Sequence, residues 1–226
     1  NAGIVLEDTP LADFAAKMID KRFHNNGQSC DALKRLLVHR SIFDDCLSQL
    51  KTELENRTFG LNSGNNTNIG PVAAQRQLDL LKDQVDDAIS KGATAITGGK
   101  PSPTLKGAYF EPTILANVTP DMRAWSEELF GPVLSVIPFD TEQEAIDIAN
   151  GTEYGLGALV FSADLDRAHR VANQLQAGTV EINHASHWLS CNPFGGYKKS
   201  GMGREHGLMG FHELCQVKVI SADKST

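Results

Sequence analysis

The feature that most constrains this chain is a regular alternation of short apolar runs with longer amphipathic stretches. Short apolar runs between turn residues predict buried strands, and apolar residues at helical spacing predict helices that cover a sheet. The expected strands are residues 35–39, 93–99, 134–139, 157–162 and 178–183, and the expected helices are residues 41–56, 72–91, 141–150 and 164–176. This βαβ rhythm favours an α/β fold in which helices flank a mostly parallel sheet.

The size and composition of the chain fit a single folded core. It has 226 residues, of which 41% are hydrophobic and 22% are charged. These values are ordinary for a globular domain and far from those of a disordered segment. The polar segments 60–70 and 100–106 are expected to be loops rather than domain boundaries. We therefore expect one large domain with an appended C-terminal tail.

The charge of the chain argues against two classes of partner. The net charge is −7 at pH 7, and Lys and Arg are scattered rather than clustered. We therefore expect neither a nucleic acid nor an anionic membrane as a partner. No apolar run approaches the ~20 residues that span a bilayer, and residues 1–10 lack the pattern of a signal peptide. These observations predict a cytoplasmic protein.

Four cysteines are spread widely along the chain, at Cys30, Cys46, Cys191 and Cys215. Wide spacing in a chain of this size favours free thiols over a disulfide framework. The sequence contains no C-x-x-C or H-x-x-x-H pattern, so we expect no metal site.

Cys30 stands out because it follows the small polar segment NNGQS, residues 25–29. Backbone and amide N–H groups of such residues can donate hydrogen bonds to a thiolate, or to an oxyanion that forms beside it. A thiolate adds reversibly to carbonyl groups, so Cys30 is a candidate catalytic nucleophile. The alternative is that Cys30 is a small buried hydrophobic residue without a chemical role.

Two further segments favour the catalytic interpretation, EELFGPV at residues 127–133 and PFGGYKKSGMGRE at residues 193–205. Together with the Cys30 segment, and in the same order, they resemble three signatures of the aldehyde dehydrogenase superfamily. The resemblance runs along nearly the whole chain but covers only the second half of a family member. It implies oxidation of a small-molecule aldehyde to a carboxylate with NAD or NADP, through a thiohemiacetal and a thioester on Cys30.

The resemblance also implies roles for individual residues. Glu128 would bind the ribose hydroxyls of the nicotinamide half of the cofactor, and Phe130 would pack near the nicotinamide ring. Trp188 and Phe194 would line the aldehyde tunnel. The alternatives are a solvated loop position for Glu128 and purely packing roles for Phe130 and Trp188.

Two positions depart from the family pattern. Asp31 stands where the family usually has a small or apolar residue, and its carboxylate would oppose thiolate formation if it approached the sulfur. Some succinate semialdehyde enzymes carry an arginine where this chain has His24, a weaker and pH-dependent clamp for a distal carboxylate. The chain is similar to semialdehyde-oxidising members, so succinate semialdehyde is a candidate substrate and His24 a candidate substrate-binding residue. We expect His184 and His187 to be ordinary surface histidines.

The resemblance divides the chain into a catalytic thiol domain, residues 1–215, and the tail of an oligomerisation arm, residues 216–226. The stretch 213–226 alternates enough to predict a strand, which is expected to be unpaired here. The family's N-terminal cofactor-binding domain, its general-base glutamate and its oxyanion-hole asparagine precede the matching region and are absent from this chain. The isolated domain is therefore expected to be nearly inactive, and the parent to be a homodimer or homotetramer.

Two other functions stay open. One is a cofactor-independent thiol hydrolase or acyl transferase, in which Cys30 works with a histidine such as His24. That function leaves the EELFGPV segment unexplained. The other is a non-catalytic domain that acts only in assembly, and it leaves the thiol unexplained.

Overall fold

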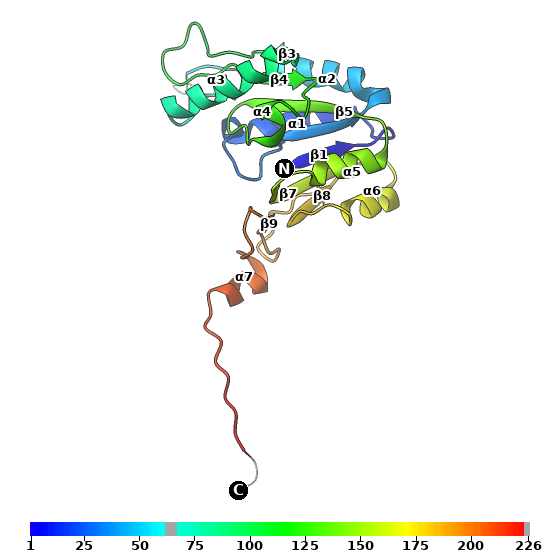
Figure 1. Cartoon of the computed structure of the whole chain (residues 1–226), viewed down its shortest axis with the longest axis vertical. Helices are drawn as coiled ribbons and strands as arrows, with labels where there is room; N and C mark the ends of the chain where they lie inside the picture. Colours follow the sequence, from blue (N-terminus) through cyan, green and yellow to red (C-terminus); the bar gives the residue numbers. More distant parts are fainter. Residues whose placement is uncertain (62–66, 224–226) are drawn as a thin grey trace.

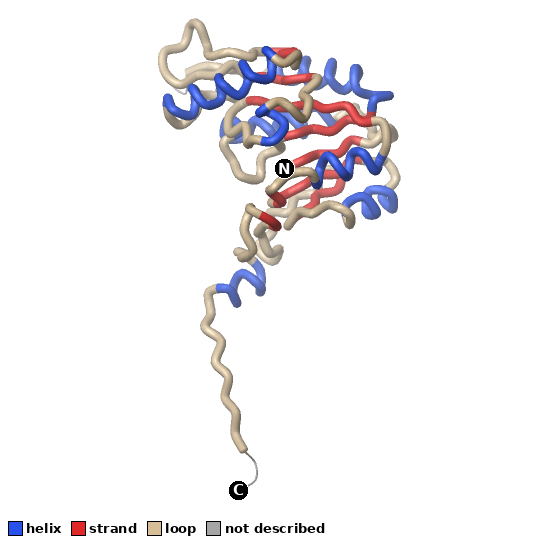
Figure 2. The backbone as a smooth tube through the Cα atoms, in the orientation of Figure 1, coloured by secondary structure: helices blue, strands red, loops and turns tan. Residues whose placement is uncertain are grey.

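The computed structural model describes residues 1–61 and 67–223. Its centre is a seven-stranded sheet with the strand order β3, β4, β5, β2, β1, β7, β8. Figure 2 shows the strands in red, with helices in blue around them. Every neighbouring pair is parallel except β3 with β4. The strands are β1 (Ala2–Val5), β2 (Arg35–His39), β3 (Thr94–Thr97), β4 (Thr113–Ala116), β5 (Val133–Phe139), β7 (Gly157–Phe161) and β8 (Thr179–Ile182). A separate antiparallel pair joins β6 (Tyr154–Gly155) to β9 (Tyr197–Lys198).

Helices cover both faces of the sheet (Figure 1). The residues of one apolar cluster come from the sheet and from α1 (Phe14–Phe23) and α2 (Phe43–Glu55). Those of the other come from the sheet and from α3 (Gln75–Ser90), α5 (Glu142–Asn150) and α6 (Leu165–Ala172). Side chains alternate along β2, since Leu36 and Val38 belong to the first cluster and Leu37 to the second. The result is a three-layer α/β/α arrangement.

Shorter helical segments complete the fold. They are α4 (Arg123–Ser126), α7 (Gly207–Glu213) and two 3₁₀ turns, His24–Gly27 and Arg40–Ile42. Among the described residues, no helix combines the length and apolar character needed to cross a membrane.

The predicted α/β architecture is confirmed, and the strands and helices expected between residues 35 and 183 are all present, with ends that differ from the predicted ones by at most a few residues. β1, β4 and α1 were not predicted, and neither were the shorter elements β6, β9, α4 and α7. The missed strands have two to four residues each, so they offer little periodicity to read. In β1, a Cβ on Gly3 would lie 3.0 Å from Leu33 Cδ1, so this glycine allows close packing. The predicted loop 60–70 lies partly outside the described residues.

The chain leaves the body after α7 and continues as an extended arm (Figure 1). Residues 211–223 are all exposed, and the arm contains no assigned strand up to residue 223. Its apolar side chains are 83–92% exposed, namely Leu214, Val217, Val219 and Ile220. The predicted tail strand is therefore an extended segment that lies outside both sheets.

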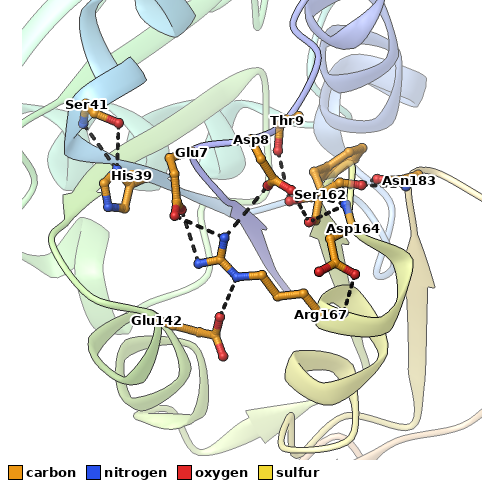
Figure 3. Close-up of polar contacts among 11 residues, drawn as sticks. Glu7, Asp8, Thr9, His39, Ser41, Glu142, Ser162, Asp164, Arg167 and Asn183 are labelled. Carbon is orange, nitrogen blue, oxygen red and sulfur yellow. Dashed lines mark hydrogen bonds and ion pairs between the residues drawn. The ribbon is translucent and has the colours of Figure 1, made fainter.

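Charged side chains gather around Arg167 of α6, at the carboxyl ends of β1 and β7 (Figure 3). Arg167 Nη1 lies 3.0 Å from Glu7 Oε1, and Arg167 Nε lies 2.7 Å from Glu142 Oε2. Asp8 accepts a hydrogen bond of 2.7 Å from Ser162 Oγ. These contacts join the loop after β1 to α5 and α6 at the carboxyl ends of the strands.

Candidate active site

Cys30 lies at the opposite end of the strands from Arg167, in the turn between α1 and the amino end of β2. The preceding residues Asn25, Asn26 and Gly27 have positive φ angles of 47°, 57° and 73°, a conformation that Asn and Gly adopt most easily. A Cβ on Gly27 would lie 2.2 Å from the carbonyl oxygen of Gly131. The backbone of the cysteine segment thus packs directly on the EELFGPV segment, and only glycine fits at this contact.

The polar side chains before Cys30 hold the backbone of the loop. Asn26 Oδ1 accepts a hydrogen bond of 2.7 Å from Gly70 N, and its Nδ2 donates to Pro71 O. Gln28 Oε1 accepts one of 2.7 Å from Ala73 N. These amides, which the sequence suggested as donors to a thiolate, are engaged with backbone groups. The loop is therefore fixed while the Cys30 side chain is exposed.

Cys30 shares a cavity with Glu128, and Lys34 lies between their two loops. Lys34 Nζ is 3.2 Å from Glu128 Oε1 and donates a hydrogen bond of 2.8 Å to the carbonyl oxygen of Ser29. The Glu128 side chain is 46% exposed. A carboxylate with access to solvent therefore faces the same cavity as the thiol.

The neighbouring Glu127 has a different role. It accepts hydrogen bonds from Arg123 Nε at 2.8 Å and from Gln84 Nε2 at 2.9 Å. The bond from Arg123 holds the pKa of Glu127 below its usual range. Glu127 thus fastens its loop to α3 and α4, and Glu128 is the glutamate of this motif that pairs across to the cysteine segment.

Phe130 is half-buried beside the same ammonium group. Its ring centroid lies 4.8 Å from Lys34 Nζ, a cation–π distance. Its carbonyl oxygen accepts a hydrogen bond of 2.8 Å from Gln77 Nε2. The structure thus brings Phe130 and Glu128, the two predicted cofactor contacts, to the ammonium group of one lysine.

Arg22 supports this loop from inside the protein. It is fully buried, and its Nη2 donates to the carbonyl oxygens of Leu129, at 2.7 Å, and Gly131. Burial lowers the pKa of Arg22 to about 9, and the negative charge of Glu128 acts in the opposite direction. A buried cation bonded to carbonyl oxygens fixes the course of the backbone at residues 129–131.

A second cavity lies on the other side of the cysteine turn. It is lined by His24, Trp188 and His184, and by Ser29 and Asp31, the two neighbours of Cys30. The ring of Phe194 stacks on that of Trp188 with centroids 5.1 Å apart. Of the three predicted substrate-binding residues, His24 and Trp188 thus line this cavity, and Phe194 adjoins it through its contact with Trp188.

Asp31 is turned towards this second cavity. Its carboxylate accepts hydrogen bonds from Ser29 Oγ and, at 3.2 Å, from Trp188 Nε1, and it lies 3.6 Å from Lys21 Nζ. Burial raises the pKa of Asp31, but the Ser29 hydrogen bond and the Lys21 charge outweigh burial, so the pKa is lowered. Asp31 thus shares Lys21 of α1 with Glu181, whose Oε1 lies closer to the ammonium group, at 3.1 Å.

The prediction that His187 is an ordinary surface residue was wrong. Its side chain is only 10% exposed, and its Nδ1 is hydrogen-bonded to Glu181, which is itself buried. Its ring stacks on Phe194 with centroids 5.6 Å apart. His184 is half-buried and lines the second cavity. The stacking partner comes from the PFGG loop, and no local pattern around His187 indicates it.

All four cysteines are free thiols, as predicted. Cys30, Cys191 and Cys215 are exposed, whereas Cys46 is buried in α2. Burial raises the pKa of Cys46 to about 12. The alternative of a buried, inert cysteine therefore applies to Cys46 and not to Cys30.

The model of the aldehyde dehydrogenase family matches residues 1–220. The chain belongs to the aldehyde dehydrogenase family. It is 43% identical over 219 residues to the succinate-semialdehyde dehydrogenase [NADP(+)] of Deinococcus radiodurans, covering 97% of this chain and 46% of that protein. The chain thus spans about half the length of this curated aldehyde dehydrogenase.

Solved structures of aldehyde dehydrogenases superpose closely on the chain. The C291A variant of aldehyde dehydrogenase C from Pseudomonas syringae, solved with NAD+ and octanal, is 37% identical with a TM-score of 0.90, covering 94% of this chain and 44% of that one. Betaine aldehyde dehydrogenase from Staphylococcus aureus, solved with NAD+, is 38% identical with a TM-score of 0.89, covering 94% and 43%. The α/β fold with its mostly parallel sheet is thus that of structurally characterised aldehyde dehydrogenases.

Sequence reasoning missed Lys34 and Arg22, the two cations that link the Cys30 region to the EELFGPV segment, and Lys21, which pairs with Asp31 and Glu181. Each has a partner far away in the sequence; the Arg22 contacts, for example, span 107 and 109 positions. A signal was present for one of them. Lys34 stands beside Arg35 at the start of a buried strand, where a charged side chain needs a partner.

Proposed function

We propose that this chain carries the nucleophile and the nicotinamide-side contacts of an NAD- or NADP-dependent aldehyde dehydrogenase, with Cys30 as the nucleophile. The observation that carries the proposal is that Cys30 lines one cavity and that its two neighbours, Ser29 and Asp31, line a second. One holds Glu128, paired with Lys34, and the other is lined by His24 and Trp188. A thiol with an acceptor carboxylate on one side and an aromatic wall on the other fits a residue that works between cofactor and substrate.

The residues on the first side suit the nicotinamide half of a dinucleotide. Glu128 keeps 46% of its side chain exposed while paired with Lys34, so its carboxylate is available to two hydroxyl donors of a ribose. Phe130 supplies an aromatic surface next to it. NAD or NADP, when bound there, takes up the hydride that leaves the substrate carbon. The resemblance assigns the rest of the dinucleotide site to a part of the family outside the matching region.

The chemistry of Cys30 follows from that placement. Its sulfur attacks the aldehyde carbon, a C–S bond forms, and the C=O electron pair moves to oxygen to give a thiohemiacetal. Loss of the hydrogen on that carbon, with its electron pair, leaves a thioester. Water then attacks the thioester, the C–S bond breaks, and a carboxylate and the free thiol result. The resemblance assigns water activation to a glutamate outside this chain.

Semialdehydes are the substrate class we favour, with succinate semialdehyde as the leading candidate. The Deinococcus radiodurans relative is named for this substrate. His24 and His184 line the second cavity, and either ring in its protonated form can bind a distal carboxylate. The aromatic wall of Trp188 and Phe194 suits the aliphatic part of such a substrate.

Assembly and domain limits are further parts of the proposal. We assign residues 1–215 to the catalytic domain and residues 216–226 to an oligomerisation arm. The apolar side chains of the arm, exposed along their length, support docking on a second copy because such surface is rarely left in contact with water. The intact enzyme would be a homodimer or homotetramer.

The thiol hydrolase alternative has less support than the dehydrogenase. Cys30 lines the cavity of Glu128, whereas His24 lines the cavity beyond Ser29 and Asp31. A hydrolase would need the histidine within hydrogen-bond reach of the sulfur.

The deciding experiment follows NAD and NADP reduction by absorbance in the intact protein that carries this chain. The aldehyde panel contains succinate semialdehyde, betaine aldehyde and octanal. We expect reduction with at least one aldehyde and a loss of at least about a thousandfold in Cys30→Ala. Cys191→Ala, which removes another exposed thiol, should keep the activity. Reduction that persists in Cys30→Ala would refute the mechanism, and ester hydrolysis without any reduction would favour the hydrolase.

A further inference from the structure

Lys34 connects the two loops of the candidate site through three contacts. Its side chain is 8% exposed, and its ammonium pairs with Glu128, donates to the carbonyl oxygen of Ser29, and lies over the ring of Phe130. Ser29 directly precedes the thiol. One buried ammonium group is thus bonded to the loop that carries Cys30 and also to both predicted cofactor contacts.

Arg22, which is buried, holds the loop of residues 129–131 from inside the protein. Its guanidinium holds the carbonyl oxygens of Leu129 and Gly131, so the backbone on both sides of Phe130 is fixed. The side chain of Glu128 depends on Lys34 for its ion pair. The two cations therefore act on different parts of the loop. Arg22 fixes its backbone, and Lys34 fixes the direction of the Glu128 and Phe130 side chains.

The charge of Lys34 is coupled to the thiol. Burial lowers the pKa of Lys34 to about 8, and the Arg22 charge acts in the same direction, whereas Glu128 and Cys30 favour the charged form. Cys30 thus lies within electrostatic reach of the Lys34 ammonium group, and an interaction between two groups acts on both of them. The loss of the Lys34 charge would therefore be felt at Cys30.

We propose, on the basis of the dehydrogenase function above, that Lys34 is a positioning residue that keeps Glu128 and Phe130 aligned with Cys30. A substrate carbon bonded to the sulfur must lie next to the nicotinamide ring for hydride transfer, and a displacement of about 1 Å between them is costly. The contacts of Lys34, which we call the tether, hold the loop of Cys30 and the loop of Glu128 and Phe130 in one arrangement. Because the Glu128 side chain stays 46% exposed, the ion pair leaves it accessible to a ribose.

The test compares three variants in the intact protein that carries this chain. Lys34→Met removes the charge and keeps most of the length, and Lys34→Arg restores a donor cation. Lys199→Met is the matched control, because Lys199 lines the same cavity but is 63% exposed and pairs with Glu153 instead. Two quantities are measured: hydrogen exchange of the amides of residues 127–131, and alkylation of Cys30 by iodoacetamide at pH 7.5, mapped by mass spectrometry.

We expect Lys34→Met to speed exchange at residues 127–131 by about tenfold and to slow Cys30 alkylation by threefold or more. Lys34→Arg should restore the exchange rate, and Lys199→Met should change neither quantity. Equal effects of Lys34→Met and Lys199→Met would overturn the proposal, because the charge alone would then matter and the contacts would not. Unchanged exchange in Lys34→Met would overturn it as well.

A second variant keeps the test sharp if Lys34→Met fails to fold. Glu128→Gln breaks the ion pair while Lys34 keeps its bond to Ser29. It should raise exchange at residues 127–131 to a similar extent, and unchanged exchange would refute the tether. Neither readout requires catalysis, so failure of the dehydrogenase hypothesis is distinguishable. In that case the exchange and alkylation effects would persist in a protein that reduces no dinucleotide.

Discussion

The indole Nε1 of Trp188 donates a hydrogen bond of 3.2 Å to Asp31 Oδ2, which joins the residue after the thiol to the aromatic wall beside it. Asp31 departs from the family pattern, and its charge raised the concern that it would oppose a thiolate. The carboxylate is instead engaged by Ser29, Lys21 and Trp188. Asp31 therefore contributes to the position of Trp188, and its carboxylate is held by three partners, of which Lys21 also pairs with Glu181.

Asp31→Ala should release Trp188. The lost hydrogen bond is worth about 1 kcal/mol, so the indole should move away from its observed position much more often. Acrylamide quenching of the Trp188 fluorescence, measured in a Trp125→Phe background, should increase. Asp20→Ala is the control, since Asp20 lines the same cavity but pairs with Arg57. Equal quenching in the two variants would show that the bond to Asp31 does not hold the indole.

The four thiols should fall into two reactivity classes. Cys46 is buried, and burial raises its pKa to about 12, so in the folded protein it should react with iodoacetamide at least about a hundredfold more slowly than Cys30. In denaturant the difference should disappear. Cys30→Ala should lose the label at that site only and keep its unfolding midpoint. Fast labelling of Cys46 in the folded protein would contradict this burial.

Arg167→Met should lower the free energy of unfolding at pH 7 by about 1 kcal/mol. The side chain is 22% exposed and pairs with Glu7 and Glu142. The Arg167 hydrogen bond also holds the pKa of Glu7 below its ordinary value of 4.5. Because that pKa is depressed in the folded state, its contribution is present above pH 4.5 and is lost as the pH falls through the lowered pKa.

Urea denaturation at pH 7 and at pH 3 measures this effect. The variant should differ most from the unmodified protein at pH 7 and less at pH 3. Arg40→Met is the control, since Arg40 pairs with Asp140 but both side chains are more than half exposed, at 59% and 57%. It should change the stability little at either pH. An equal loss in the two variants would mean that the Arg167 cluster has no special role.

Much of the fold was predictable because the longer elements carry clear periodicity. The strand at residues 35–39 was placed at its observed limits, and α5 began one residue from its predicted start. The strand order was not predictable. β1 pairs with both β2 and β7. The contact with β7 joins two segments that lie far apart in the sequence. Local patterns carry no information on such pairing.

Candidate site residues could be proposed from the sequence where they belong to a motif. They could not be proposed where their role depends on contacts with distant parts of the chain. Cys30 and Glu128 were proposed from the family signatures and Trp188 from the segment before the third one, and their roles stay predictions. The role of Lys34 depends on a glutamate in a distant loop, and that of His187 on stacking against Phe194. The site also lies at the amino ends of β1 and β2, whereas open parallel sheets usually bind ligands at the carboxyl ends of their strands. The carboxyl ends of β1 and β7 carry instead the charged side chains around Arg167 (Figure 3).

Gly27→Ala tests the contact between the two motif loops. Gly27 has a φ of 73°, and a Cβ there would lie 2.2 Å from the carbonyl oxygen of Gly131, so the backbone must move. We expect a loss of about 2 kcal/mol or more in the free energy of unfolding, measured by urea denaturation. Gly60→Ala is the control, because a Cβ there meets nothing within 4 Å. Since the clash separates the loops that hold Cys30 and Glu128, hydrogen exchange at residues 127–131 should also rise. A stable Gly27→Ala protein with unchanged exchange would mean that the two loops are not packed as the structure has them.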